Sequence, residues 1–342
     1  MCAMLVGVMS MRPVCVIGLG LIGGSLLRDL HAKGWTVFGF NRSPSAVKQA
    51  CDEGFDASSC LEDTLQRAER EGALIVLATP MPAIPSMLDA VMEHAPSCGI
   101  TDVVSVKTEV YDLVRERGLQ DRYVGGHPMA GTANSGWEAA HEGLFQGAAW
   151  VVTFDQAAED SEGVSEQWVG LWRDVATVAS AVGAEVIPAR VGVHDAAVAR
   201  ISHLPHVLAE ALAIVGDNGG ALALSLAAGS FRDGTRVAGT VPSLVRAMCE
   251  TNNVALLAAL DETIDLLVDA RANLAGEESS VEELVDAGYR SRVRYEARAG
   301  EARGGASTGG SNRPVLRVKP GAPKWVSQLE QAEALGARVD VF

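Results

Sequence analysis

The sequence predicts an α/β fold: a Rossmann-type, doubly wound and mostly parallel sheet followed by an all-α dimerisation domain. Three observations support this prediction. In the first half of the chain, short apolar runs alternate with amphipathic segments of helical length. A glycine-rich turn directly follows the first apolar run. In the second half the strand-like runs disappear and long helical segments replace them, which indicates two different domains.

The strand-like runs of the first half are short, apolar and bounded by glycine, proline or polar residues. They cover residues 14–17, 36–40, 73–78, 100–104 and 123–126. The amphipathic segments between them cover residues 21–33, 45–53, 61–71, 84–94 and 107–117. Two further strand candidates, 149–154 and 184–187, flank a helix over 166–182 and are expected to extend the same sheet. We therefore predict a Rossmann domain over residues 12–190.

The second half begins near His194 and consists of helical segments rich in Ala and Leu. These segments cover residues 195–216, 221–228, 242–274 and 281–297. Helices this apolar need more partners than one small domain supplies. We therefore expect an all-helical domain over residues 191–298 that forms a homodimer.

Both ends of the chain lie outside these two predicted domains. Residues 1–11 are apolar without a preceding basic segment. We interpret them as a disordered leader, or as the result of a start codon placed too early, rather than as a signal peptide. Residues 299–342 form a Gly/Ser/Ala linker and a short C-terminal extension with one strand (314–318) and one helix (325–335). The sequence assigns this extension no function.

Composition excludes several classes of function. The 342 residues carry a formal net charge of −15, which disfavours nucleic acid because a polyanion requires a basic surface. The six cysteines form no C-x-x-C pair, so neither a metal site nor a disulfide framework is expected, and this usage fits the cytoplasm. No apolar run reaches the roughly 18 residues that a membrane span requires. We expect a cytoplasmic protein that binds no metal, nucleic acid or membrane.

The glycine-rich turn predicts a dinucleotide site. A pyrophosphate binds backbone N–H groups at a helix N-terminus, and glycines are needed where a Cβ would block its approach. A tight turn without a ligand would not explain why Gly24 and Ser25 also keep the start of the helix small. Thr79 follows the third strand of the same sheet. The residues assigned to the cofactor in these two segments are Gly18, Gly20, Leu21, Ile22, Gly23 and Thr79.

The choice between NAD and NADP depends on the end of the second strand. An NAD-binding domain usually presents Asp or Glu there, whereas this chain has Asn41-Arg42-Ser43. The Arg42 guanidinium and the Ser43 hydroxyl could hold a 2′-phosphate without a carboxylate to repel it. The alternative is that Arg42 is a solvated loop charge. The cofactor is therefore NADP or NAD, with NADP slightly favoured.

Two polar residues are the candidates for catalysis. Ser105 and His127 follow neighbouring strands on the side of the sheet where ligands bind. An imidazole with a pKa near its usual value of about 6.5 can take a hydroxyl proton while the carbinol carbon surrenders hydride. Ser105 could orient that imidazole or hold the substrate hydroxyl. A structural histidine that caps a turn is the alternative.

Several segments together resemble the prephenate and arogenate dehydrogenases of tyrosine biosynthesis. Residues 18–25 and 102–107 take part in this resemblance, as does Phe231-Arg232-Asp233-Gly234-Thr235-Arg236. The resemblance spans residues 14 to about 297. Its two most specific segments are Gly126-His127-Pro128-Met129-Ala130-Gly131-Thr132 and Ser202-His203-Leu204-Pro205-His206.

The resemblance implies roles for particular residues. His127 removes the proton of the ring C4 hydroxyl as hydride passes to the nicotinamide and carbon dioxide leaves from the ring carboxylate. Arg236 forms a bidentate pair with a substrate carboxylate, and His206 helps to position the substrate. His203 is either a second partner of the substrate or a satisfied core or cap residue. Arg232 is either a second anion clamp or a surface charge. Thr132 also belongs to the substrate site, but the acidic residue that follows it in many relatives is replaced here by Ala133.

The substrate and the class of enzyme leave alternatives open. We expect prephenate rather than arogenate, because no carboxylate that would recognise the arogenate ammonium can be located from sequence. The alternative is that an unplaced carboxylate such as Asp233 reaches this ammonium group. A β-hydroxyacid dehydrogenase would use a lysine of the helical domain, yet no lysine occurs between Lys107 and Lys319. The third alternative is a non-catalytic, dinucleotide-sensing regulator. The joint presence of the candidate catalytic and substrate residues argues against it.

Overall fold

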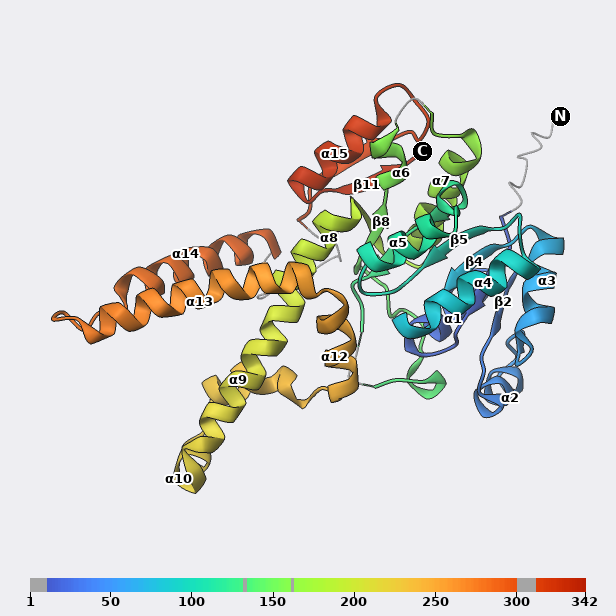
Figure 1. Cartoon of the computed structure of the whole chain (residues 1–342). Coiled ribbons are helices and arrows are strands. Elements are labelled where there is room, and N and C mark those ends of the chain that lie inside the picture. The colour runs from blue at the N-terminus through green and yellow to red at the C-terminus, as the bar shows by residue number, and fades with distance from the viewer. Residues whose placement is uncertain (1–10, 132–133, 161–162, 300–311) are drawn as a thin grey trace, which may run out of the picture. The chain divides into compact units, whose positions relative to one another are not determined.

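The chain folds into two compact units in the computed structural model (Figure 1). The structure describes residues 11–131, 134–160, 163–299 and 312–342. Unit 1 comprises Met1–Arg190 and Val315–Phe342, and unit 2 comprises Val191–Pro314. The C-terminal extension thus belongs to the same unit as the N-terminal half of the chain. We describe each unit by itself.

Unit 1 is built on a six-stranded parallel sheet, which confirms the predicted Rossmann-type fold. The strand order is β3-β2-β1-β4-β5-β6, so the winding direction reverses between β1 and β4. This reversal opens a crevice at the carboxyl ends of the strands, where such folds bind ligands. The strands are β1 (Val14–Ile17), β2 (Val37–Phe40), β3 (Ala57–Ser58), β4 (Leu74–Leu77), β5 (Gly99–Asp102) and β6 (Tyr123–Val124).

Helices connect these strands, as the alternating pattern predicts. The central strands β1 and β4 are buried at every residue because helices cover both faces of the sheet. The short β3 was not among the predicted strands. The connecting elements are α1 (Leu21–Ala32), α2 (Pro44–Asp52), α3 (Leu61–Glu71), η1 (Met81–Ala83), α4 (Ile84–His94), α5 (Thr108–Glu116) and η2 (Gln120–Arg122).

The later strands of unit 1 form a second sheet, so the prediction that they extend the first one was wrong. This sheet has the order β7 (Gly126–Pro128), β8 (Ala149–Thr153) and β9 (Glu185–Ala189). The chain changes sheets at Gly125, whose N–H donates to Thr153 Oγ1 at 2.9 Å and whose carbonyl accepts from Thr153 N at 2.9 Å. The strand β7 therefore pairs antiparallel with β8. The linking elements are η3 (Trp137–Ala139), α6 (Asp155–Glu159) and α7 (Glu166–Ala181).

The C-terminal extension is a β-α-β element that packs on β9 and α7. It contains the predicted strand and helix, β10 (Val315–Val318) and α15 (Trp325–Leu335), and an unpredicted strand β11 (Arg338–Val341) parallel to β10. The ring of Trp325 lies 5.7 Å from that of Trp172, centroid to centroid. The buried Glu333 carboxylate accepts from the Arg190 backbone N–H at 2.6 Å and also binds its guanidinium. The extension is therefore part of the core of unit 1.

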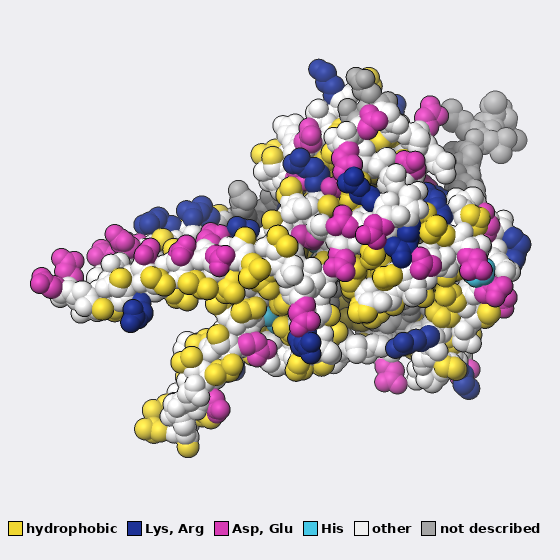
Figure 2. Space-filling model, in the orientation of Figure 1, with side chains coloured by type: hydrophobic (Ala, Val, Ile, Leu, Met, Phe, Trp, Pro, Cys, Tyr) yellow, Lys and Arg dark blue, Asp and Glu magenta, His cyan; other side chains and the backbone are white. Residues whose placement is uncertain are grey.

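Unit 2 is helical throughout its described residues. Few of its side chains are buried, whereas large apolar ones are exposed, among them Leu222 (70%), Leu226 (73%) and Val254 (80%). Figure 2 shows apolar side chains along these helices. The elements are α8 (Val191–Val198), the π-helix η4 (Ala199–His203), α9 (Leu204–Asn218), α10 (Gly220–Leu226), α11 (Gly229–Thr235), η5 (Arg236–Gly239), α12 (Pro242–Thr251), α13 (Asn253–Ala275) and α14 (Glu282–Ala299).

One stretch of unit 2 differs from the expectation that no segment is long and apolar enough to cross a membrane. The continuous helix Val191–Asn218 contains an 18-residue stretch with a mean hydropathy of 1.3, of which 22% is buried. By length and composition alone, this helix is long and apolar enough to cross a membrane. The sequence pattern divided this stretch at His194, so its full helical length was missed. The same composition also occurs in a helix that packs against a second protein chain.

Candidate functional site

The glycine turn between β1 and α1 has the geometry of a pyrophosphate site. Gly18 has φ +107°, and a Cβ on it would lie 2.6 Å from the Ala78 carbonyl oxygen. A Cβ on Gly23 would lie 1.9 Å from the Gly18 oxygen, so this glycine allows the helix to approach the strand. Around Gly20, in contrast, there is open space. No side chain caps α1, which leaves its first N–H groups facing that space.

A groove of about 680 Å³ begins at this turn. Five of the predicted cofactor residues line it: Gly18, Gly20, Asn41, Arg42 and Thr79. The Thr79 hydroxyl is buried and has no hydrogen-bond partner among the described residues. Arg42 is exposed at the groove, and none of the ion pairs found in the described part of the chain involves it. A dinucleotide fits this arrangement, because an orphan hydroxyl and an uncompensated cation both lie where its polar groups would bind.

The remaining predicted cofactor residues lie beside the groove. Leu21 and Ile22 form the first turn of α1 and are half-buried. Asn41 fixes the end of β2, because its side-chain amide donates to the Leu19 carbonyl at 3.2 Å and accepts from Ser43 N at 3.1 Å. The Ser43 hydroxyl accepts from Ala46 N at 3.4 Å and so caps α2.

The small residues that follow the glycine turn serve packing, which corrects our interpretation of Gly24 and Ser25. A Cβ on Gly24 would lie 2.8 Å from the Ala140 side chain and 3.1 Å from the Trp137 ring. The Ser25 hydroxyl accepts from His141 N at 3.0 Å. These two residues therefore let the segment after η3 dock on α1, and they give no support for a ligand.

Ser105 lies at the carboxyl edge of the sheet that also holds the glycine turn, whereas His127 lies on β7 of the second sheet. Ser105 is half-buried in the connection between β5 and α5, and His127 is half-buried on β7, opposite Val151 of β8. A Cβ on Gly126 would lie 2.7 Å from the carbonyl oxygen of Asp102, the last residue of β5. The residue before His127 therefore touches the strand end that leads to Ser105.

Sequence reasoning missed a buried polar cluster at this edge. Asp102 and Lys107 are both fully buried and form an ion pair. The Asp102 carboxylate also accepts from the Tyr123 hydroxyl at 2.5 Å. Burial, together with the negative charge of Asp102, holds the pKa of Tyr123 well above its usual value, so the hydroxyl remains a donor. The available signal was an aspartate and a lysine at the two ends of a segment whose other residues are three valines and Ser105.

The predicted substrate residues of unit 2 lie on three elements. His206 is half-buried in the first turn of α9, and its Nδ1 is buried without a partner among the described residues. Arg232 lies on α11 with a strongly exposed side chain 3.5 Å from Asp233. Arg236 is exposed at the start of η5, which packs against α9. Ser105 and His127 belong to unit 1, whereas these three belong to unit 2. Thr132 and Ala133 lie outside the described residues.

His203 occupies a different environment from His206. It is 1% exposed at the end of the π-helix, and its Nδ1 lies 3.2 Å from the Asn252 side-chain amide. The same amide donates to the Asp195 carbonyl at 2.9 Å. Burial lowers the pKa of His203, so the neutral ring is favoured. His203 is thus part of a satisfied buried network.

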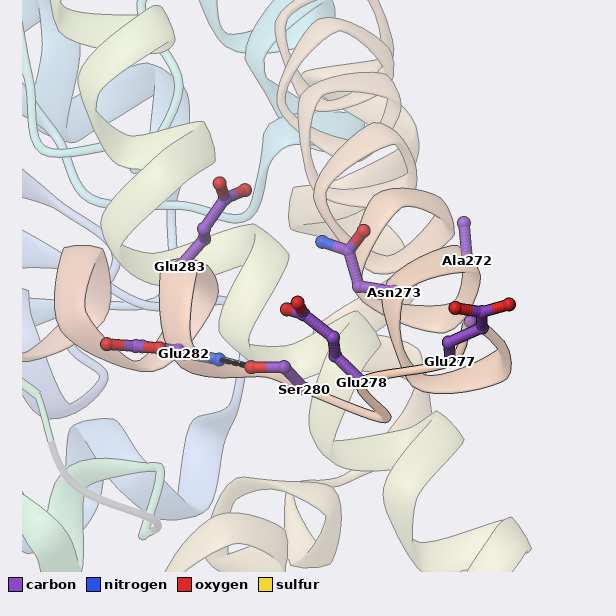
Figure 3. Close-up of a pocket in the computed structure, with 8 residues that line it drawn as sticks. Ala272, Asn273, Glu277, Glu278, Ser280, Glu282 and Glu283 are labelled. Atoms are coloured by element: carbon purple, nitrogen blue, oxygen red, sulfur yellow. Dashed lines mark hydrogen bonds between the residues drawn. The ribbon is translucent and has the colours of Figure 1, made fainter.

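A separate hollow at the turn between α13 and α14 does not suit an anionic substrate. Figure 3 shows that carboxylates line it, including Glu277, Glu278, Glu282 and Glu283. Like charges repel an anion. Across the described residues, no group of three or more His, Cys, Asp or Glu side chains is arranged to hold a metal ion.

The fold and the groove define a dinucleotide-dependent dehydrogenase. Residues 26–180 match the family model described as "Prephenate dehydrogenase, nucleotide-binding domain", and residues 191–287 match "Prephenate dehydrogenase, dimerization domain". The chain belongs to the prephenate dehydrogenase family and is an NAD(P)-dependent oxidoreductase.

Individual relatives agree with this membership. The chain is 32% identical to the prephenate dehydrogenases of Bacillus subtilis over 73% of its length and of Lactococcus lactis over 67%. It spans 67% and 61% of the length of those two relatives.

Two solved structures are similar over the whole fold. A candidate prephenate dehydrogenase from Corynebacterium glutamicum has 62% identity and a TM-score of 0.90, with 97% of this chain and 99% of that chain covered. Arogenate dehydrogenase from Synechocystis has 31% identity and a TM-score of 0.70, with 83% of this chain and 100% of that chain covered.

Proposed function

We propose that this protein is a cytoplasmic prephenate dehydrogenase of tyrosine biosynthesis, which converts prephenate to 4-hydroxyphenylpyruvate and carbon dioxide. The observation that supports it best is the position of His127 and Ser105, beside the strand ends that carry the dinucleotide groove. When bound, the nicotinamide accepts the hydride. The chain supplies a base, a hydroxyl and cations for the two substrate carboxylates.

His127 acts as the general base in this proposal. Its ring accepts the proton of the substrate C4 hydroxyl while the hydride leaves the ring of prephenate. Loss of the ring carboxylate as carbon dioxide makes the ring aromatic, which makes the step effectively irreversible. Ser105 holds the same hydroxyl or orients the imidazole. Because β7 is paired with β8 through the backbone on both sides of His127, the imidazole is carried by a rigid element.

The substitution His127→Asn separates an enzyme from a dinucleotide sensor. We expect kcat to fall by roughly 10²–10⁴-fold, while the Kd for cofactor stays within about twofold of wild type. Retention of kcat would contradict the role of His127. Absence of turnover by the wild-type protein with either prephenate or arogenate would contradict the proposed function itself.

Arg236 binds a substrate carboxylate in this proposal, and Arg232 provides the matched control. Both side chains are exposed arginines of unit 2, four positions apart. Loss of a charge-assisted bidentate pair costs about 1.5–3 kcal/mol, so Arg236→Gln is expected to raise KM for prephenate about 10- to 100-fold. If Arg232 is only a surface charge, Arg232→Gln leaves KM unchanged. An equal rise in both variants would make Arg232 a second clamp.

The substrate is prephenate rather than arogenate in this proposal. The relatives at 31–32% identity include proteins named for each substrate, so their names do not decide it. The decision rests on the cationic residues assigned to the site and on the absence of an identified partner for an ammonium group. Comparison of kcat/KM for the two purified substrates tests it. Turnover of arogenate alone would reverse the preference.

The cofactor is NADP in preference to NAD. The support is Arg42, which lines the groove without an ion pair in the described residues, and Asn41, which stands where an acidic residue would select NAD. We expect Arg42→Ala to raise KM for NADP about tenfold, because a charge-assisted contact is lost, and to leave KM for NAD unchanged. A strong NAD preference in the wild type that Arg42→Ala does not alter would contradict this assignment.

A further inference from the structure

A buried ion pair lies directly beneath the segment that carries Ser105. Asp102 ends β5 and Lys107 precedes α5, and both side chains are 0% exposed. Removal of two charges from water costs several kcal/mol for each ion unless further hydrogen bonds satisfy them. Apolar side chains of similar volume often stabilise a core equally well. Stability alone therefore does not explain why this pair occurs here.

The Asp102 carboxylate closes the segment from 102 to 107 into a loop. Its Oδ1 accepts from Lys107 Nζ at the far end of the segment and from Val104 N at 2.7 Å in the middle. Its Oδ2 accepts from the Tyr123 hydroxyl of β6 at 2.5 Å. Three donors from two elements thus converge on one carboxylate, and Ser105 lies inside the closed segment. Val104 is thus held through its backbone N–H on one side of Ser105, and Lys107 through its side chain on the other.

The same aspartate contacts the strand of the proposed base. Gly126 leaves room for the Asp102 carbonyl oxygen, which would lie 2.7 Å from a Cβ at that position. His127 is the next residue. Asp102 therefore contacts two segments. Its carboxylate binds groups on both sides of Ser105, and its carbonyl oxygen contacts β7.

We infer that Asp102, Lys107 and Tyr123 are positioning residues, which hold Ser105 in register with His127 for proton removal. This inference rests on the function proposed above. Misplacement of a catalytic group by about 1 Å can cost about 10²-fold in rate. A carboxylate with three donors limits such movement, because a shift of Val104 would break its backbone bond to Asp102.

A double-mutant cycle between Lys107 and Ser105 tests the inference. Lys107→Met keeps the unbranched side chain as far as Cε and removes the charged ammonium group. We expect kcat to fall about 30-fold, with KM for prephenate and Kd for cofactor within about twofold of wild type. If Lys107 acts through Ser105, the substitution costs less than about threefold when introduced into Ser105→Ala. Losses that multiply would overturn the inference, as would an unchanged kcat in Lys107→Met.

Tyr123→Phe provides a milder second test, since Lys107→Met leaves a carboxylate buried without its cation. The substitution removes one hydrogen bond, and we expect kcat to fall about threefold to tenfold. As with Lys107→Met, this fall in kcat should shrink when the substitution is introduced into Ser105→Ala. Lys48→Met is the matched control, because the Lys48–Asp52 pair is exposed and neither residue lines the groove. It is expected to leave kcat unchanged.

Hydrogen exchange at the Val104 N–H distinguishes a failure of this inference from a failure of the proposed function. The Val104 N–H is bound to the Asp102 carboxylate, so Lys107→Met and Tyr123→Phe should both speed its exchange at least tenfold relative to wild type. Unchanged exchange would overturn the inference even in an active enzyme. If the wild type turns over neither prephenate nor arogenate, the proposed function fails and the inference fails with it, whatever the exchange rates.

Discussion

The two units of this protein bury their apolar residues in different ways. Unit 1 encloses its large side chains, including Trp150, Trp168 and Trp172, which are 0–2% exposed. Unit 2 instead leaves apolar residues such as Leu222 and Val254 at 70% and 80% exposure. Large exposed apolar side chains on several helices are typical of an interface, and residues 191–287 match a dimerization domain. We therefore predict that the stability of unit 2 depends on a second copy of the chain more strongly than the stability of unit 1 does.

The largest effect is expected from the core of unit 1. Trp172 is 0% exposed, its indole N–H donates to the Thr153 carbonyl at 3.1 Å, and its ring contacts Trp325 of the C-terminal extension. Trp172→Ala should lower the free energy of unfolding by about 3–5 kcal/mol, through a cavity and an unsatisfied carbonyl. Chemical denaturation measures it. A loss under about 1 kcal/mol would contradict the view that the extension and α7 share one core.

The second-largest effect is expected from substitutions that weaken the proposed homodimer. The double substitution Leu222→Glu/Leu226→Glu alters two strongly exposed residues of α10, and such changes are nearly neutral on a true monomer surface. In an interface they should raise the dimer Kd more than about 100-fold, because charges would be buried. Sedimentation velocity over a range of concentrations measures this. Met92→Glu, which changes an exposed residue of unit 1, is the control and should leave the dimer intact.

A smaller effect concerns the attachment of the C-terminal extension. The Glu333 carboxylate is 6% exposed and binds both the backbone and the guanidinium of Arg190, the last residue of unit 1 before α8. Glu333→Gln should lower the free energy of unfolding of unit 1 by about 1–3 kcal/mol, because charge-assisted hydrogen bonds are lost. Glu330→Gln changes an exposed carboxylate of the same helix that acts on Arg190 only through its charge, and it should have a clearly smaller effect. Equal losses in the two variants would contradict a specific role for Glu333.

The smallest effect is a pH dependence that belongs to unit 2. Burial lowers the pKa of His203 below the value of 6.5 expected in the unfolded chain. Below pH 6.5, His203 becomes protonated in the unfolded chain while it stays neutral in the folded chain. The stability contributed by neutral His203 is therefore present above pH 6.5 and is lost as the pH falls toward the pKa of His203 in the folded chain. His203→Gln retains an acceptor for Asn252 and should flatten this slope in acid titrations of Tm. An unchanged slope would exclude His203 as its source.

Much of the fold was predictable because its signals are local. The period of apolar residues located the strands and helices of the Rossmann sheet. The turn from Gly18 to Gly23 identified the crevice, since Gly18 and Gly23 allow close backbone approaches and Gly20 leaves open space. The place where the chain leaves the sheet was not predictable. It depends on Gly125 bonding to Thr153, a residue far along the chain, and no local pattern encodes that choice.

The sequence by itself determined the fold class, the position of the glycine turn and the pair Ser105 and His127 as candidates for chemistry. Tertiary structure alone decided that 149–154 and 184–187 form a second sheet, that Gly24 serves packing, that the C-terminal extension joins the core of unit 1, and that Asp102, Lys107 and Tyr123 converge beneath Ser105. The physical reason is the distance along the chain over which each kind of interaction acts. Backbone propensity and periodicity act over a few residues, whereas burial and the satisfaction of polar groups depend on which distant segments meet.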